Sequence, residues 1–246
     1  ADEAREKITP LRKGMCGILR KLALDQVVAK PWRLAVLAPL FSRYAGSGLQ
    51  RLVRASGMLR IAGLAELEAQ LPSPLTPAPR PGIYPAEGAA RGAVGLFLGC
   101  AARILDGEAL SAAVLVLNRL GYTVHVPARQ SCCGGLHREA GRAAAAHELA
   151  AQNIAAFSEK GLGAIVSVAS GCGARLAEYG GNAAAEEFSA RVYDISAFLA
   201  DAGGWDTLVV APLAAGILVH EPCTLRNALR AEAAPYQLLK RIPQAV

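Results

Sequence analysis

The sequence has few aromatic residues, few charges and no long apolar run. Aromatic residues make up 5% and charged residues 19% of the 246 positions, whereas 53% are hydrophobic. This composition is typical of a folded protein rich in Ala, Leu and Val and excludes a disordered chain. A membrane-spanning helix needs about 18 to 20 apolar residues in a row. Pro212 interrupts the longest run, 208–219, so we expect no transmembrane helix.

The usual signatures of export, nucleotide binding and hydrolysis are also missing. Residues 1–5 lack an initiator Met and the charged-then-apolar order of a signal peptide, so we expect a trimmed or partial chain. The sequence contains no phosphate loop, no GxGxxG after the first expected strand and no Ser-His-Asp set. Six cysteines, two of them adjacent, are too few for a disulfide scaffold. They favour a reducing compartment, and hence a cytoplasmic location.

Positive charge is concentrated in the first 60 residues. This segment holds 12 Lys or Arg against 4 Asp or Glu, a balance of +8, whereas the whole chain carries +6. The excess indicates a docking surface for a partner subunit or peripheral contact with a membrane, although a solvated basic helical face explains it equally well. Because no binding motif accompanies the charge, nucleic acid is not an expected partner.

Prolines divide the chain into a helical lead-in, a linker and a cysteine-rich domain. Apolar residues at helical spacing predict short helices over residues 1–71, broken at prolines and glycines. Residues 72–92 contain six prolines and no periodic pattern, which predicts an extended linker or a strap over a neighbouring element. Residues 93–246 are expected to form the cysteine-rich domain.

From residue 93 onward, short apolar runs alternate with helix-like segments. The runs are 94–98, 122–126 and 164–168, and the helix-like segments are 108–120 and 138–159. This alternation predicts an α/β fold of parallel βαβ units, preceded by the helical N-terminal segment. Because the crossovers are right-handed and the strands parallel, the strand ends gather along one edge of the sheet.

Four cysteines follow the ends of these three expected strands. Cys100 follows the first, Cys132 and Cys133 the second, and Cys172 the third. Ligands bind beyond the carboxyl ends of such strands, where helix N-terminal amides favour thiolates. The sequence therefore predicts a cysteine-ligated metal site, by preference an iron-sulfur cluster. Burial of the thiols for packing alone is the alternative, but it gives no reason for two adjacent cysteines in a loop.

The remaining cysteines have less specific surroundings. Cys16 lies among helical residues and is expected to be a core or interface thiol. Cys223 follows the apolar run 217–219 and precedes the helix-like segment 226–242, which together predict a second, incomplete copy of the strand-and-cysteine pattern. In that copy Cys223 would lie apart from Cys172.

Two histidines are candidates for tuning the site. His137 follows the cysteine pair at the head of an expected helix, and His220 precedes Cys223. Either side chain would act through a hydrogen bond, and His137 also as an iron ligand. A plain helix-start histidine is the more frequent explanation for His137.

The cysteine arrangement resembles the cysteine-rich CCG domain family. It comprises Cys100, 31 intervening residues, the Cys132–Cys133 pair, 38 more residues and Cys172. The family includes a subunit of heterodisulfide reductase and iron-sulfur subunits of lactate-utilisation, anaerobic glycerol-3-phosphate dehydrogenase and glycolate oxidase systems. The sequence around the cysteines, Ser-Cys-Cys-Gly-Gly at 131–135 and His-Glu-Pro-Cys at 220–223, resembles the glycolate oxidase subunit most.

This resemblance implies an iron-sulfur electron-transfer subunit that takes electrons from a flavin-containing subunit oxidising a 2-hydroxy acid. Two departures limit the comparison. Ala169 stands where members with a non-cubane cluster have another cysteine, so four sulfurs remain, which suits a [4Fe-4S] cluster or tetrahedral zinc. The ferredoxin-type Cys-x-x-Cys-x-x-Cys runs of glycolate oxidase subunits are missing from the sequence.

Two other functions are compatible with the same residues. A zinc-stapled interaction module without a redox role would use the same four cysteines. An enzyme with Cys132 or Cys133 as nucleophile and His137 as base is a further alternative, but it needs one activated thiol and not four converging ones. Metal analysis distinguishes the three functions. Iron with sulfide supports electron transfer, zinc supports the staple, and the absence of both supports the nucleophile.

Overall fold

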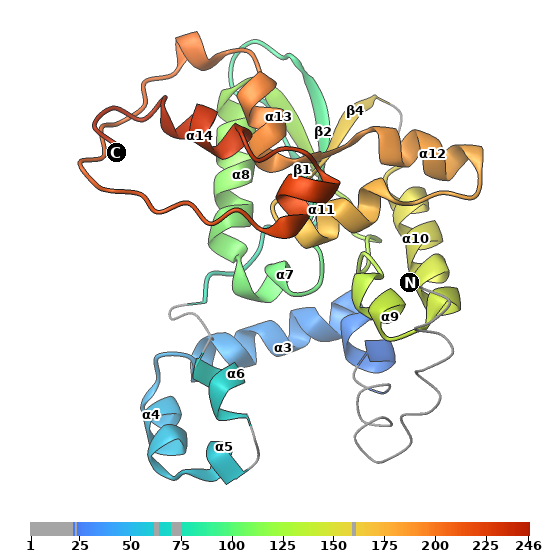
Figure 1. Cartoon of the computed structure of the whole chain (residues 1–246), viewed down its shortest axis with the longest axis vertical. Helices are drawn as coiled ribbons and strands as arrows, with labels where there is room; N and C mark the ends of the chain where they lie inside the picture. Colours follow the sequence, from blue (N-terminus) through green and yellow to red (C-terminus); the bar gives the residue numbers. More distant parts are fainter. Residues whose placement is uncertain (1–21, 23, 62–63, 70–74, 159–160) are drawn as a thin grey trace.

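A five-stranded, mostly parallel β-sheet lies at the centre of the cysteine-rich part (Figure 1). The computed structural model describes residues 22, 24–61, 64–69, 75–158 and 161–246. The strands are β1 (Gly82–Tyr84), β2 (Gly92–Phe97), β3 (Tyr122–Val126), β4 (Leu162–Ser167) and β5 (Val192–Asp194). Their order in the sheet is β1-β3-β2-β4-β5.

Strands β2, β3 and β4 confirm the expected α/β fold of parallel βαβ units. β2 pairs in parallel with β3 on one side and with β4 on the other, so that Val94 lies opposite both Val124 and Ala164. The edge strands were not expected. β1, which lies in the predicted linker, pairs antiparallel with β3, and β5 pairs in parallel with β4. Each has three residues, which is too short for a periodic pattern to identify.

Helices cover both faces of the sheet. Because side chains alternate along a strand, Leu96 of β2 packs into one apolar cluster and Phe97 into the other. The first cluster includes residues of α8 (Gly107–Arg119) and α13 (Ile195–Asp201), and the second includes residues of α10 (Ala143–Ala156) and α12 (Ala183–Ala190). Strand β2 is therefore buried on both faces, as expected for a central parallel strand.

The expected helix 138–159 is interrupted. The chain forms α9 (Gly135–Glu139) first and continues as α10 only from residue 143. Between them Gly141 has a φ of 67°, a left-handed conformation that ends a helix.

The C-terminal segment also differs from expectation. In place of one helix over 226–242 it forms η4 (Thr224–Ala228) and α14 (Ala234–Leu239), separated by Arg230 with a φ of 52°. Within the described segment 161–246 the run 217–219 forms no strand, and an isolated bridge joins Ala215 to Ala245. The strand expected at 217–219 is therefore absent from this segment, and the incomplete second copy remains a prediction. The remaining helices are α7 (Ala102–Leu105), α11 (Ser170–Ala177) and η3 (Trp205–Thr207).

Short helices precede the sheet, as the N-terminal pattern predicts. They are η2 (Leu24–Val28), α3 (Pro31–Tyr44), α4 (Gly48–Ala55), α5 (Met58–Ile61) and α6 (Ala65–Ala69). Cys16 lies outside the described residues. Among the helices of the described segments, none is long and apolar enough to cross a membrane.

One carboxylate joins three of these helices. Glu68 of α6 accepts hydrogen bonds from Gln50 at 2.7 Å and from Arg54 at 2.8 Å, both in α4. The Tyr44 hydroxyl, at the end of α3, donates to the same carboxylate at 3.2 Å. The helices are thus held together by polar contacts as well as by packing.

Residues 75–81 form a strap across the start of α8, one of the two expectations for the proline-rich segment. A Cβ atom at Gly107 would lie 1.9 Å from the Thr76 carbonyl oxygen, so the strap touches α8 only because residue 107 has no side chain. The chain then enters β1. The expected domain limits, 1–71, 72–92 and 93–246, remain predictions.

Candidate metal centre

The four cysteines lie beyond the carboxyl ends of three adjacent strands. Strand β2 lies between β3 and β4, and its neighbours are reached through helices on opposite faces of the sheet. At such a position the loops diverge and leave a crevice for a ligand. Cys100 follows β2, Cys132 and Cys133 follow β3, and Cys172 lies in the first turn of α11 after β4. The structure thus brings the four predicted residues together.

Their thiols interact one after another. The Sγ atoms of Cys132 and Cys100 are 3.6 Å apart. The Cys133 thiol interacts with those of Cys132 and Cys172. Cys172 is partly exposed, the other three are buried, and each of the four is a free thiol.

Because the thiols contact one another, two of them have lowered pKa values and two have raised ones. The pKa of Cys100 is lowered, mainly by a hydrogen bond from Cys132, and that of Cys133 is lowered further by hydrogen bonds from Cys132 and Cys172. The pKa values of Cys132 and Cys172 are raised, first because they donate these hydrogen bonds and then because burial penalises the thiolate. Metal binding requires thiolates, so a bound metal would replace the retained protons.

Two glycines in the left-handed conformation shape the cysteine loops. Gly99 has a φ of 67°, and a Cβ atom there would lie 3.5 Å from the Cys172 Sγ atom. Gly134 has a φ of 81°, and its N–H group donates to the Cys132 Sγ atom at 3.5 Å. Residues other than glycine rarely adopt such φ values. Both loops therefore depend on glycine for their approach to sulfur.

A buried hydrogen-bond network holds the loop that carries the cysteine pair. Asn153 of α10 accepts from the Ser131 N–H group at 2.7 Å and donates to the Cys132 carbonyl at 3.0 Å. It also donates to the Tyr179 hydroxyl at 3.1 Å, which donates to the Cys133 carbonyl at 2.9 Å. Neither Asn153 nor Tyr179 was predicted from the sequence. One signal could have indicated Asn153, because asparagine has a poor helix propensity and yet lies inside an Ala-rich helix.

Gln130 ties the same loop to β2, and it was not predicted either. Its side chain is fully buried. The Nε2 atom donates to the Leu96 carbonyl at 3.2 Å, and the Oε1 atom accepts from the Leu98 N–H group at 2.8 Å. These bonds continue the pairing of β2 after β3 has ended, so the loops that carry Cys100 and Cys132 are joined.

Two arginines lie near the thiols. Arg175 of α11 helps to lower the pKa of Cys133, and Arg103 of α7 interacts with Cys100. The Nε atoms of both arginines are buried and have no hydrogen-bond partner among the described residues. Their positive charge favours thiolates and would offset the negative charge of a thiolate-ligated metal group.

The donor set suits a metal that prefers sulfur. Thiolates are soft ligands that select iron-sulfur clusters or zinc. The sulfurs lie against an apolar cluster that includes Phe97 and Leu149, which limits access of water. Among the described residues, no group of three or more His, Cys, Asp or Glu side chains surrounds a position for a single metal ion. The residues fit a sulfur-ligated group by the chemistry of their donors.

His137 is buried in α9 and faces the N-terminal helices. Its Nε2 atom lies 3.7 Å from the Asp25 carboxylate, which also pairs with Arg142. Burial is the main cause that lowers the pKa of His137. Among the described residues His137 makes no hydrogen bond to a cysteine, so its expected tuning of the site remains a prediction.

Cys223 directly precedes an element that packs against the cysteine-bearing helix α11. η4, which follows it, packs against α11, and the hydroxyl groups of Thr224 and Ser170 are 2.8 Å apart. Cys223 is exposed, and among the described residues no sulfur contact joins it to Cys172. His220 is exposed as well.

Curated proteins similar to the chain carry iron-sulfur and redox names. "Probable glycolate oxidase iron-sulfur subunit" of Bacillus subtilis (strain 168) is 31% identical over 259 residues, covering 99% of this chain and 58% of the relative. A fumarate reductase (CoM/CoB) subunit of Methanothermobacter marburgensis is 31% identical over 154 residues, covering 61% and 29%. "Lactate utilization protein A" of Geobacillus kaustophilus is 29% identical over 157 residues, covering 61% and 64%. The chain thus spans less than two thirds of each relative. No solved structure matches it.

Two family models match separate parts of the chain. Residues 94–177 match the cysteine-rich domain, from β2 to the end of α11, and this range includes the four converging cysteines. Residues 17–71 match the linker region of the glycolate oxidase iron-sulfur subunit. Residues 94–177 therefore form a cysteine-rich domain of the CCG family, preceded at 17–71 by a segment similar to the linker region of glycolate oxidase iron-sulfur subunits.

Proposed function

We propose that the chain is the iron-sulfur electron-transfer part of a complex in which a flavin subunit oxidises a 2-hydroxy acid such as glycolate. The convergence of four thiols at three adjacent strand ends carries this proposal. The Bacillus subtilis relative, whose similarity covers 99% of the chain, supports it. The ligands would be Cys100, Cys132, Cys133 and Cys172, and their number suits a [4Fe-4S] cluster.

The residues of this chain would hold the cluster and set its surroundings. When bound, an iron-sulfur cluster supplies one-electron transfer, whereas the chemistry on the substrate belongs to the flavin. Arg103 and Arg175 would favour the more negative, reduced state by their charge. Asn153 and Tyr179 would fix the loop of the cysteine pair, and the apolar cluster would exclude water.

Helices α3, α4 and α5 would form the docking surface for the flavin subunit. Apolar side chains on these helices are more than half exposed, namely Val36, Leu40, Leu49, Leu52 and Met58. They lie among the arginines of the basic segment, and exposed apolar groups rimmed by charge mark interaction sites. Figure 1 shows α4, α5 and α6 as a lobe that projects away from the sheet. Peripheral contact with a membrane is the second proposed role of this surface.

A zinc-stapled interaction module is the second candidate. Two sulfurs on a tetrahedral zinc with Zn–S bonds of about 2.3 Å lie about 3.8 Å apart. The 3.6 Å between Cys132 and Cys100 is close to that spacing. This alternative uses the same four residues, has no electron-transfer role, and requires the thiols to rearrange, because no three of the described donors surround one ion position.

Metal analysis after anaerobic purification tests the proposal. We expect about four iron and four sulfide ions per chain, as a [4Fe-4S] cluster requires. With the flavin subunit and glycolate present, the visible absorbance of the chain should bleach as it accepts electrons. One zinc without sulfide would support the staple instead. Absence of both metals would exclude both candidates.

A further inference from the structure

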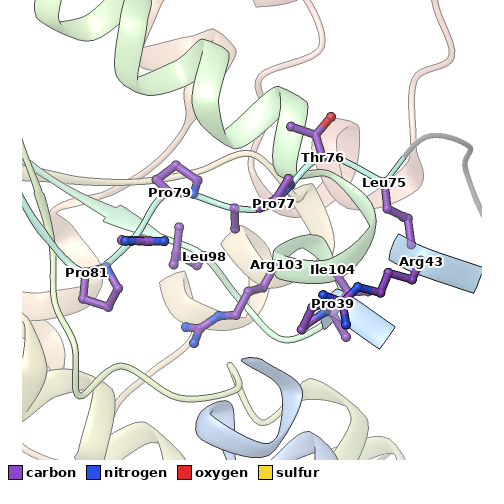
Figure 2. A pocket seen from close by; sticks show the side chains of 12 residues that line it. Pro39, Arg43, Leu75, Thr76, Pro77, Pro79, Pro81, Leu98, Arg103 and Ile104 are labelled. Atoms are coloured by element: carbon purple, nitrogen blue, oxygen red, sulfur yellow. The ribbon is translucent and has the colours of Figure 1, made fainter. Parts of the chain in front are cut away.

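A cavity of about 420 Å³ lies between α3, the strap and the segment that follows β2 (Figure 2). Figure 2 shows Pro77, Pro79 and Pro81 along the strap, with Arg103 and Ile104 nearby and Arg43 reaching in from α3. None of the described cysteines lines the cavity, which adjoins the candidate metal centre through Arg103.

Its lining combines apolar walls with uncompensated positive charge. Pockets for small molecules have volumes of about 300 to 1,000 Å³, mainly apolar walls and a few polar groups that orient the ligand. Here prolines, Leu75, Leu98 and Ile104 supply the walls, and Arg43, Arg80 and Arg103 supply the polar groups. Among the lining residues that the structure describes, none is Asp or Glu.

Arg103 has an unmet hydrogen-bonding requirement. Its Nε atom is buried and has no partner in the described part of the chain. Burial is the main cause that lowers the Arg103 pKa, which means that the guanidinium has lost hydration. Cys100 acts on it only through charge. A carboxylate in the cavity would offset this poorly hydrated charge by pairing with the guanidinium, which binds planar carboxylates with two parallel bonds.

We propose that this cavity binds a small organic carboxylate with an apolar body, held at its charged end by Arg103 and assisted by Arg43. The volume is too large and the walls too apolar for glycolate, which has no apolar part to bury. Such a ligand would contact the segment Leu98–Ile104 on both sides of Cys100. The proposal shares Arg103 with the proposed cluster site but requires no cluster chemistry.

Calorimetric titration of the anaerobically purified full chain with naphthalene-2-carboxylate tests the proposal. The neutral amide of the same ring system serves as the matched ligand. We expect the carboxylate to bind at least about tenfold more tightly than the amide, because a hydrogen bond to a charged group is worth that factor. Arg103→Met should abolish this preference while leaving the affinity for the amide unchanged. Arg43→Gln should weaken carboxylate binding about threefold.

Arg119→Gln is the control, since Arg119 is exposed on α8 and does not line the cavity. Circular dichroism and urea unfolding of each variant report whether it has folded. If Arg103→Met does not fold, Arg43→Gln decides, because Arg43 is exposed. Equal affinity for acid and amide, binding of neither, or unchanged carboxylate binding in the folded arginine variants overturns the proposal.

Discussion

Asn153 satisfies buried backbone groups that no neighbouring strand can reach. The loop after β3 places the Ser131 N–H group and the Cys132 carbonyl away from water, and the Asn153 amide pairs with both. An apolar residue of the same size would fill the space, leave the Ser131 N–H group without its partner and remove a hydrogen bond to the Cys132 carbonyl. The energetic cost of those groups makes Asn153 the residue that most directly supports the cysteine pair.

We predict that Asn153→Leu lowers the free energy of unfolding by about 2 to 4 kcal/mol, because each unsatisfied buried group costs about 1 to 3 kcal/mol. Tyr179→Phe should cost about 1 kcal/mol through the lost hydroxyl. Urea unfolding measures both values. Gln152→Leu is the control on the adjacent, exposed position of α10. Equal stability of the two leucine variants would contradict the role assigned to Asn153.

The sequence predicted the four cysteines but not the residues that hold their loops in place. The adjacent cysteines, the following glycines and the spacing from strand ends are local patterns, and the structure brings these residues together. Asn153 and Tyr179 lie 21 and 46 residues from their carbonyl partners, Cys132 and Cys133. Pairing of that kind depends on how α10 and α11 pack, which no local pattern contains.

The arrangement of helices α3, α4 and α6 depends on the Glu68 carboxylate. The pKa of Glu68 is lowered, mainly by the hydrogen bond from Arg54 and next by that from Gln50. A carboxyl group whose folded pKa lies below its unfolded value stabilises the fold above the unfolded pKa. That contribution is lost as the pH falls through the folded pKa.

We predict that α4 and α6 loosen on acidification below about pH 4, the usual range of a glutamate pKa. Hydrogen exchange of their amides should therefore accelerate, relative to the sheet, as the pH falls. Glu68→Gln should remove this extra dependence, whereas Glu66→Gln, an exposed substitution in the same helix, should retain it. A Glu68→Gln protein with the unaltered pH profile would show that the carboxylate does not hold the helices.

The sequence pattern predicted some helix and strand bounds correctly and missed others. Strand β3 has the expected bounds, Tyr122–Val126, because its apolar run is flanked by Gly121 and Pro127. The break between α9 and α10 was missed because Ala residues on either side of Gly141 continue a helical pattern. The run 217–219 is apolar like a strand, but the sheet provides it with no neighbouring strand within the described segment 161–246.

For the whole molecule, the separate places of the proposed docking helices and of the cysteine-bearing sheet suggest how a complex would assemble. The surface on α3, α4 and α5 would bind the flavin subunit, and α7, which follows Cys100, contacts α3. Association through the exposed arginines should be sensitive to salt, because about 0.15 M salt screens charges beyond roughly 8 Å.

We predict that affinity for the flavin subunit falls between low and high ionic strength. The double substitution Arg51→Gln and Arg60→Gln should weaken binding at low salt and flatten its salt dependence. A control with Arg119→Gln and Lys240→Gln removes the same charge from exposed positions outside the lobe. Surface plasmon resonance at several salt concentrations measures both. Binding that ignores salt in the unsubstituted protein would contradict docking by charge.

The iron and sulfide content of cysteine variants tests the central claim most directly. Anaerobically purified Cys100→Ser, Cys132→Ser, Cys133→Ser and Cys172→Ser proteins should each lose most of both ions, because each removes one of four thiolate ligands. Cys223→Ser should keep the content of the unsubstituted chain, because its exposed thiol makes no contact with Cys172 among the described residues. Full occupancy in the Cys132→Ser and Cys133→Ser double variant, or loss of iron from Cys223→Ser as complete as from Cys172→Ser, would contradict the four-cysteine assignment.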